Sequence, residues 1–300
     1  MENNRTAGHL TALFTIIIWG TTFISTKILL EDFKPVEILF IRFLIGFIVL
    51  FIVCPRRLKN TTPKQELTFA AAGLCGVCLY YLMENIALTY SMASNVGVIV
   101  SSAPLFTALL SRLFLKDEGR LGVSFFIGFA AAMAGIALIG FSGTELSLNP
   151  LGDMLALLAA LIWGFYSVFS KKISGWGFNV VLATRRTFFY GLLFMIPALV
   201  IFGFDPKIEC FAKPENLFNI IYLGMGASAL CFVTWNYAVR ILGAVETSLY
   251  IYVGPVITVS ASALILKEKI TGIAVIGTVL ILAGLLLSSG KAFFRKEEHK

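Results

Sequence analysis

The chain has 300 residues, of which 58% are hydrophobic and only 14% are charged, and its formal net charge is +7. A soluble chain of this length would carry roughly a quarter charged residues, so the composition excludes an ordinary soluble domain. The mean hydropathy of +0.88 and the long apolar runs instead predict a polytopic membrane protein. The positive charge calls for no nucleic-acid partner, because basic residues at the cytoplasmic ends of membrane spans account for it.

Ten stretches of the sequence are long and apolar enough to cross a membrane as helices of about 20 residues. In chain order they cover 9–30, 36–54, 67–89, 94–115, 121–141, 152–173, 179–203, 217–239, 245–266 and 271–289. We therefore expect an all-α membrane protein with ten transmembrane helices joined by short connections. The lysines and arginines outside these spans favour a cytoplasmic N-terminus and a cytoplasmic C-terminus.

Two long stretches of the sequence align with each other without a gap, which indicates an internal repeat. Asn85 to Asp117 aligns with Asn236 to Glu268, and each copy carries a proline at the same place, Pro104 and Pro255. Earlier helices match as well, and the aligned residues are Trp19-Gly20 with Trp163-Gly164, Lys27 with Lys171, and Arg42 with Arg186.

Each half of the chain contains five of the predicted spans, and because five is odd the second half enters the membrane upside down. Transporters with inverted repeats bind substrate near the membrane midplane, where the two halves meet. The expected units are a first five-helix repeat over 1–143 and an inverted second repeat over 144–290. A basic cytoplasmic tail, 291–300, follows them.

These motifs resemble those of the ten-helix EamA family in the drug/metabolite transporter superfamily. The resembling residues are the two Trp-Gly pairs, Arg42-Phe43, the helices that run from Pro104 to Asp117 and from Pro255 to Glu268, and the glycine-containing closing helices with Gly128, Gly135, Gly277 and Gly284. The resemblance covers about residues 9–289. It implies a secondary carrier of the bacterial inner membrane, of a kind that mostly exports amino acids, related metabolites or drugs and sometimes imports small metabolites.

Polar residues recur on one face of the first and sixth spans. Thr22 belongs to a series of threonines at helical spacing beside Trp19, and Trp163 and Tyr166 occupy the sixth span. A polar stripe facing lipid is costly, so we expect this face to line a water-filled cavity. In the alternative interpretation the hydroxyls bond to carbonyls of their own helix.

Glu84 is the one carboxylate clearly inside an apolar span, and Tyr81 and Asn85 flank it. An ionisable group in the membrane is a functional candidate by default, here for carrying a proton or holding a substrate ammonium group. Alternatively, Glu84 forms an ion pair with Lys27 or Arg42. In the second repeat Trp235 stands at the equivalent position, so Glu84 is not part of the duplicated scaffold.

The prolines of the fourth and ninth spans are expected to bend both helices near the substrate site. Proline removes one helical hydrogen bond and frees a carbonyl group, so Pro104 and Pro255 are candidate hinges, or else static kinks. The polar residues expected beside them are Ser101, Ser102, Trp235, Asn236 and Tyr252. The duplicated pairs Lys27/Arg42 and Lys171/Arg186 are candidate gates or scaffold, one pair near each membrane face.

Other classes of function fit the sequence less well. A P-loop that would hydrolyse ATP is missing, and the spans lack the paired carboxylates or histidine clusters that an intramembrane enzyme needs. A lipid flippase could share the fold. We expect a small-molecule substrate and the lipid bilayer as partners, no nucleic acid, neither a cofactor nor a metal, and a monomer or homodimer in which the glycines of the fifth and tenth spans form packing or dimer surfaces.

Overall fold

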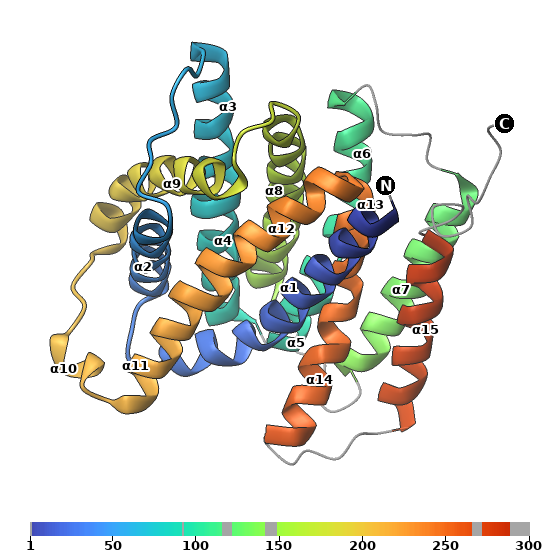
Figure 1. Ribbon diagram of the computed structural model, residues 1–300. Coiled ribbons are helices and arrows are strands. Elements are labelled where there is room, and N and C mark those ends of the chain that lie inside the picture. Colours follow the sequence, from blue (N-terminus) through green and yellow to red (C-terminus); the bar gives the residue numbers. More distant parts are fainter. Residues whose placement is uncertain (1, 92, 116–121, 142–148, 266–271, 289–300) are drawn as a thin grey trace, which may run out of the picture.

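The computed structural model describes residues 2–91, 93–115, 122–141, 149–265 and 272–288, and the basic tail expected at 291–300 lies outside them. These residues form helices joined by short connections, and no β-strand occurs among them (Figure 1). The helices of the first half are α1 Glu2–Leu29, α2 Pro35–Val53, α3 Pro63–Gly73, α4 Tyr80–Tyr90, α5 Ala93–Val100, α6 Ala103–Phe114 and α7 Val123–Phe141. Those of the second half are α8 Pro150–Ser174, α9 Val180–Phe202, α10 Ile208–Phe211, α11 Pro214–Ile221, α12 Cys231–Leu242, α13 Ala244–Ser248, α14 Gly254–Ile265 and α15 Gly272–Ser288.

The membrane spans predicted from the sequence correspond to these helices. Within the described residues, six helical stretches are long and apolar enough to cross a membrane: Asn4–Leu29, Pro35–Val53, Pro63–Tyr90, Pro150–Ser174, Val180–Phe202 and Pro214–Leu242. Shorter apolar helices at Ala103–Phe114, Val123–Leu138, Ala244–Ile257 and Val275–Ser288 match the remaining predicted spans. Large apolar side chains such as Leu67, Val200 and Phe218 are exposed on the surface of the bundle, as expected for a surface that faces lipid. The all-α membrane fold is confirmed.

Local sequence signals explain where several helices begin and end. Asn149 and Asn179 each accept hydrogen bonds from two backbone N–H groups at the starts of α8 and α9, which satisfies donors that have no partner inside the helix. Gly203 and Gly243 end α9 and α12 with φ of 70° and 95°, a conformation that favours glycine.

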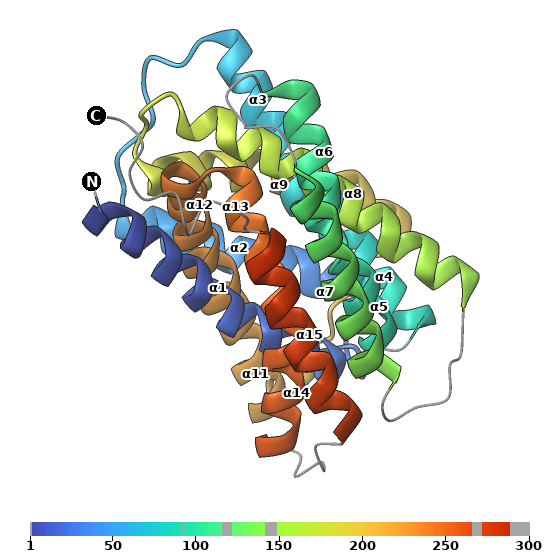
Figure 2. The same cartoon turned by 90° about the vertical axis from the view of Figure 1, so that its right-hand side faces the viewer.

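The two halves pack by exchanging partners rather than as separate bundles. α1 of the first half packs most extensively on α12 of the second, and the equivalent helix α8 packs on α4 and α6 of the first half. In the same way α2 packs along the helix that contains α12, and α9 along the helix that contains α4. Both views show α7 and α15 side by side at the edge of the bundle (Figures 1 and 2).

Irregular helical geometry occurs at equivalent places in the two repeats. A π-helical segment, Leu74–Leu79, joins α3 to α4, and another, Tyr222–Leu230, joins α11 to α12. The fourth span is interrupted at Ser101 and Ser102 between α5 and α6, and the ninth contains the 3₁₀ segment Leu249–Val253. Both interruptions immediately precede the prolines, because proline cannot donate the hydrogen bond that would continue the preceding turn.

Glycines at helix contacts let these exchanged helices approach closely. A Cβ atom at Gly73 would lie 2.6 Å from the backbone of α9 at Gly191 and Thr187. The glycines of the fifth and tenth spans also face each other within the chain, since a Cβ at Gly128 would lie 2.6 Å from the Gly284 carbonyl oxygen. These glycines therefore serve packing between α7 and α15, one of the two roles expected for them.

Candidate functional site

The tryptophans of the two repeats meet at the centre of the bundle. The rings of Trp19 on α1 and Trp163 on α8 lie 5.4 Å apart, edge to face, an arrangement that aromatic pairs favour. Trp235 on α12 lies 5.1 Å from Trp19. Residues that the repeat makes equivalent, Trp19 and Trp163, can touch each other only where the two halves meet, so this contact marks the interface between the repeats.

Each Trp-Gly pair has two separate tasks. The tryptophan points to the centre, whereas the glycine next to it allows close approach of a neighbouring broken helix. A Cβ at Gly20 would lie 2.8 Å from Ile257 on α14, and one at Gly164 would lie 3.0 Å from Phe106 on α6. Sequence reasoning identified the tryptophans but not the role of the glycines.

The π-helical segments receive aromatic side chains from the opposite repeat. The indole Nε1 of Trp19 donates a hydrogen bond of 2.9 Å to the carbonyl oxygen of Ala227. In the other repeat the ring of Tyr166 lies against Gly76, where a Cβ would come within 2.1 Å of it. Single π turns recur at functional sites because they displace carbonyls and side chains from the regular helical pattern.

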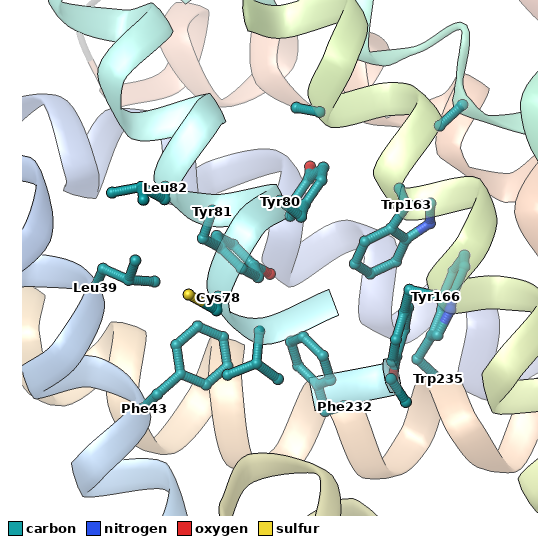
Figure 3. Close-up of a cluster of buried hydrophobic side chains, with 14 of the residues drawn as sticks. Leu39, Phe43, Cys78, Tyr80, Tyr81, Leu82, Trp163, Tyr166, Phe232 and Trp235 are labelled. Atoms are coloured by element: carbon teal, nitrogen blue, oxygen red, sulfur yellow. The ribbon is translucent and has the colours of Figure 1, made fainter. Parts of the chain in front are cut away.

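Further aromatic side chains from both halves converge around these tryptophans (Figure 3). Tyr80 packs against Trp163 at 4.8 Å and against Tyr81 at 4.7 Å. Phe43 and Phe232 complete the cluster, with ring centroids 5.6 Å apart. Tyr81 and Trp163 were predicted as site residues. Phe43 and Phe232 were not, because phenylalanine in an apolar helix gives no sign of whether it faces lipid or the interior.

A polar network borders the aromatic cluster and contains Tyr166 and Asn236, two of the predicted substrate-binding residues. The Asn236 side-chain oxygen accepts hydrogen bonds from the Tyr166 hydroxyl at 2.9 Å and from the Ser170 hydroxyl at 2.7 Å. Its amide nitrogen donates to the Thr184 hydroxyl at 3.0 Å. Three helices, α8, α9 and α12, are thus joined through one amide side chain.

A pocket opens beside this network. It is partly open to solvent, and it is lined by Tyr166, Ser170, Ile173, Ser174, Phe178, Val180, Ala183, Thr187, Asn236 and Arg240. Arg240 is exposed and makes no hydrogen bond or ion pair with any residue in the described part of the chain. The pocket therefore combines hydroxyl groups, an amide and a positive charge in reach of a small solute.

Arg42 and Glu84 are both buried near Tyr81, with 2% and 7% of their surfaces exposed. The Arg42 guanidinium lies 4.6 Å from the centre of the Tyr81 ring, and its Nε donates a hydrogen bond of 3.0 Å to the Ser228 hydroxyl. Glu84 has Tyr80 and Arg42 as its influential polar neighbours. No ion pair within 4.0 Å joins Glu84 to Arg42 or Lys27 among the described residues.

The residues of the duplicated basic pairs have different surroundings. Lys27 is exposed whereas Arg42 is buried. Arg186 instead forms a 2.8 Å ion pair with Glu66 at the start of α3, and Lys171 takes no part in it. Because Arg42 and Arg186 are equivalent in the sequence, equivalent surroundings were expected. The residue equivalent to Glu66 is Leu217, however, so Arg42 has no carboxylate in the position that Glu66 takes beside Arg186.

Three hydroxyl groups among the predicted site residues bond to carbonyls of their own helices. Thr22 donates to Trp19 O at 2.7 Å, Ser101 to Gly97 O at 2.7 Å, and Ser102 to Ile99 O at 2.6 Å. The Thr22 bond is of the kind that the alternative interpretation of the first span describes, whereas Thr15 on the same face also bonds to Thr234 of α12 at 2.7 Å. Near the interruption, the Gly97 and Ile99 carbonyls accept bonds both from these hydroxyl groups and from the backbone N–H groups of Ser101 and Ser102.

Two other predicted residues lie apart from the tryptophan cluster. Asn85 donates its side-chain amide to Pro35 O at 3.2 Å, which ties α4 to the start of α2. Tyr252 is fully buried in a separate cluster with Phe125 and Ile281 of α7 and α15. Pro104 is buried, whereas Pro255 is only partly buried, and each stands at the start of the helix that follows its interruption.

Comparison with known proteins shows which family the chain belongs to. The family described as the EamA-like transporter family matches residues 6–141 and 150–290. The chain belongs to the EamA-like transporter family. The resemblance to the drug/metabolite transporter superfamily is therefore confirmed.

The chain is similar over most of its length to several transporters of other organisms. An uncharacterized transporter of Archaeoglobus fulgidus is 27% identical, and the match covers 96% of this chain and 99% of the relative. The uncharacterized inner membrane transporter YedA of Escherichia coli is 28% identical over 94% of this chain and 91% of its own. A probable terminal-alkyne amino-acid exporter of Streptantibioticus cattleyicolor is 23% identical over 95% of this chain and 94% of its own. The family and these relatives are transporters, so this chain is a transporter and not an enzyme.

A solved crystal structure has the same fold. It superposes with a TM-score of 0.78 at 20% sequence identity and covers 97% of this chain and 99% of its own. The fold described above is therefore shared with a solved structure over almost all of both chains.

Proposed function

We propose that this EamA protein is a secondary-active carrier that exports amino acids or related small metabolites by alternating access. The single observation that carries the proposal is the meeting of Trp19 and Trp163 at 5.4 Å. Two inverted repeats that share a central contact can rock about it and expose that centre to each side in turn. We propose the units 1–143 and 144–290 as the two bodies that rock.

The proposed substrate class is supported by one relative and by the chemistry of the centre. The Streptantibioticus cattleyicolor relative is named a probable terminal-alkyne amino-acid exporter. Indole and phenol rings around polar groups suit a small solute with a partly apolar side chain. The name of the Escherichia coli relative, an inner membrane transporter, supports the same location for this chain, with both ends in the cytoplasm as proposed from charge placement.

In this proposal the interruptions of the fourth and ninth spans are the hinges. Helices α6 and α14 begin at Ala103 and Gly254, immediately before Pro104 and Pro255, and hinges are commonly residues at the ends of elements. Trp19, Trp163, Trp235 and Tyr81 would surround the substrate. The pocket with Tyr166, Asn236 and Arg240 would admit it from the side on which α8 ends.

The proposal can be tested in liposomes that contain the purified protein. Uptake and efflux of a panel of labelled amino acids are measured with and without a pH gradient, beside liposomes without protein. Saturable flux of at least one amino acid, accelerated by the gradient, is expected for a coupled exporter. Flux of drugs or other metabolites without amino acids would replace the substrate class, and exchange of labelled phospholipid between leaflets would instead indicate a flippase.

A further inference from the structure

Several buried polar atoms around the aromatic cluster have no hydrogen-bond partner in the described part of the chain. They are Nη2 of Arg42, Oε2 of Glu84, Nε1 of Trp163 and Nε1 of Trp235, with Ser111 Oγ and Tyr252 OH lying elsewhere. Buried polar groups in proteins are nearly always paired, so each exception needs a physical reason. Four exceptions around one cluster point to a partner that arrives from outside the chain.

The two ionisable exceptions lie beside the same tyrosine pair. Arg42 lies over the Tyr81 ring at 4.6 Å, and Tyr81 contacts Tyr80 at 4.7 Å. Tyr80 in turn is the polar neighbour of Glu84, one helical turn away on α4. Arg42 and Glu84 are close enough to interact electrostatically, but no ion pair within 4.0 Å joins them among the described residues.

This arrangement belongs to the first repeat alone. The equivalent of Arg42, Arg186, is neutralised by Glu66 at 2.8 Å, and the equivalent of Glu84 is Trp235. A group needed only for the scaffold would be expected in both repeats. Keeping two ionisable side chains without an ion-pair partner inside a membrane protein is costly, and such residues are retained for substrate or ion pathways.

We propose that Arg42 and Glu84 bind the two charged ends of a zwitterionic α-amino acid, with its carboxylate on Arg42 and its ammonium group on Glu84. The assignment rests on the proposed function as an amino-acid carrier. Arg42 Nη2 donates to the carboxylate, Glu84 Oε2 accepts from the ammonium group, and the side chain of the amino acid packs against the tryptophan cluster. The indole N–H groups of Trp163 and Trp235, which have no partner among the described residues, are further hydrogen-bond donors in the cluster.

Three probes that share one side chain separate the two ends of the ligand. L-phenylalanine carries both charges, phenethylamine lacks the carboxylate and 3-phenylpropanoate lacks the ammonium group. L-leucine, isoamylamine and 4-methylpentanoate form a second set. Binding of each probe to the purified full-length transporter is measured by competition against the labelled amino acid of its set, L-phenylalanine or L-leucine. In the wild type we expect the amine and the acid to bind at least about tenfold more weakly than the amino acid. The reason is that a hydrogen bond to a charged group is worth roughly 1.5–3 kcal/mol.

Each variant is expected to lose the preference for one end only. Arg42→Gln lowers the affinity for the amino acid to that for the amine and leaves amine binding unchanged, which also shows that the variant is folded. Glu84→Gln lowers the affinity for the amino acid to that for the acid, the probe without an ammonium group, and leaves binding of the acid itself unchanged. Arg42→Lys restores part of the lost preference. Arg186→Gln, which removes the equivalent arginine of the second repeat, is the matched control and leaves the ratios of the three affinities unchanged.

Other outcomes overturn the assignment. Equal weakening of all three probes in Arg42→Gln and Glu84→Gln would mean that both residues act on the structure. Recovery of amino-acid binding in the double variant Arg42→Gln/Glu84→Gln would mean that they neutralise each other. If the wild type carries amino acids in liposomes but shows no preference among the probes, the assignment alone is wrong; if it carries none, the proposed function is wrong as well.

Discussion

Asn236 holds three helices together through hydrogen bonds to Tyr166, Ser170 and Thr184. Replacing it by leucine leaves these hydroxyl groups without their partner, and an unsatisfied buried group costs about 1–3 kcal/mol. We predict that Asn236→Leu lowers the midpoint of thermal unfolding in detergent more than Ser170→Ala, which removes a single bond. Equal midpoints for the two variants would show that Asn236 is not the centre of the network.

Asp32 joins the connection between α1 and α2 to the second repeat. Lys213 Nζ donates to both of its oxygens at 2.7 Å and Asn216 donates to one at 2.7 Å. These hydrogen bonds lower the pKa of Asp32 below its ordinary value of 3.8 and the bond to Asp32 raises the pKa of Lys213 above 10.5. The contribution of the Asp32–Lys213 pair to the stability of the fold is therefore fully present between pH 3.8 and pH 10.5, the two ordinary pKa values. It disappears as the pH falls through the lowered pKa of Asp32, or rises through the raised pKa of Lys213.

This linkage gives a test by acid titration. Between pH 5 and pH 3, approximate limits set on either side of the ordinary carboxyl pKa, the unfolding midpoint of the wild type should fall more steeply than that of Asp32→Asn. High salt should reduce the difference, because the pair is exposed and screened. Parallel curves for the two proteins would mean that the pair contributes nothing measurable, as many surface ion pairs do.

At the scale of the elements, the close contact of α3 and α9 depends on Gly73. We predict that Gly73→Val destabilises the protein by about 1–3 kcal/mol, a typical cost of overpacking, because its Cβ would lie 2.6 Å from the backbone of α9. Gly97→Ala is the control, since no atom of the described residues lies within 4 Å of the added methyl group. Thermal unfolding in detergent compares the two, and a Gly73 variant as stable as the control would contradict the packing described.

The sequence predicted the elements better than their contacts. The in-register repeat located both tryptophans and both prolines, because a duplicated motif stands out in any single sequence. It could not show that the span 94–115 divides into α5 and α6 at Ser101 and Ser102, nor that Thr22 bonds to its own helix. Both outcomes depend on contacts between neighbouring helices, which the pattern of the sequence does not show.

The charged residues show the same limit more clearly. Alignment made Arg42 and Arg186 equivalent, but their surroundings differ because Glu66 has no acidic counterpart in the second repeat. Arg42 is directed into the bundle toward Ser228, which belongs to a π-helical segment. A π turn shifts the helical register by one residue, and the hydrophobic pattern of an apolar span carries no sign of that shift.

At the scale of the whole molecule, the inverted arrangement makes a prediction about two equivalent loops. Lys59 precedes α3 and Lys207 precedes α11, and both side chains belong to exposed residues. Five predicted spans lie between these loops. Because five is odd, the loops must emerge on opposite sides of the membrane, and the placement of basic residues puts Lys59 in the cytoplasm.

Single cysteines at these positions test the prediction directly. The five native cysteines are free, so they are first replaced, and Lys59→Cys and Lys207→Cys are then made separately. A membrane-impermeant maleimide is expected to label Lys207→Cys on intact cells and Lys59→Cys only after the membrane is opened. The reverse pattern would turn the whole protein over but keep the repeats inverted. Labelling of both cysteines from the same side would require an even number of spans between them, and two such halves could not rock about a shared centre.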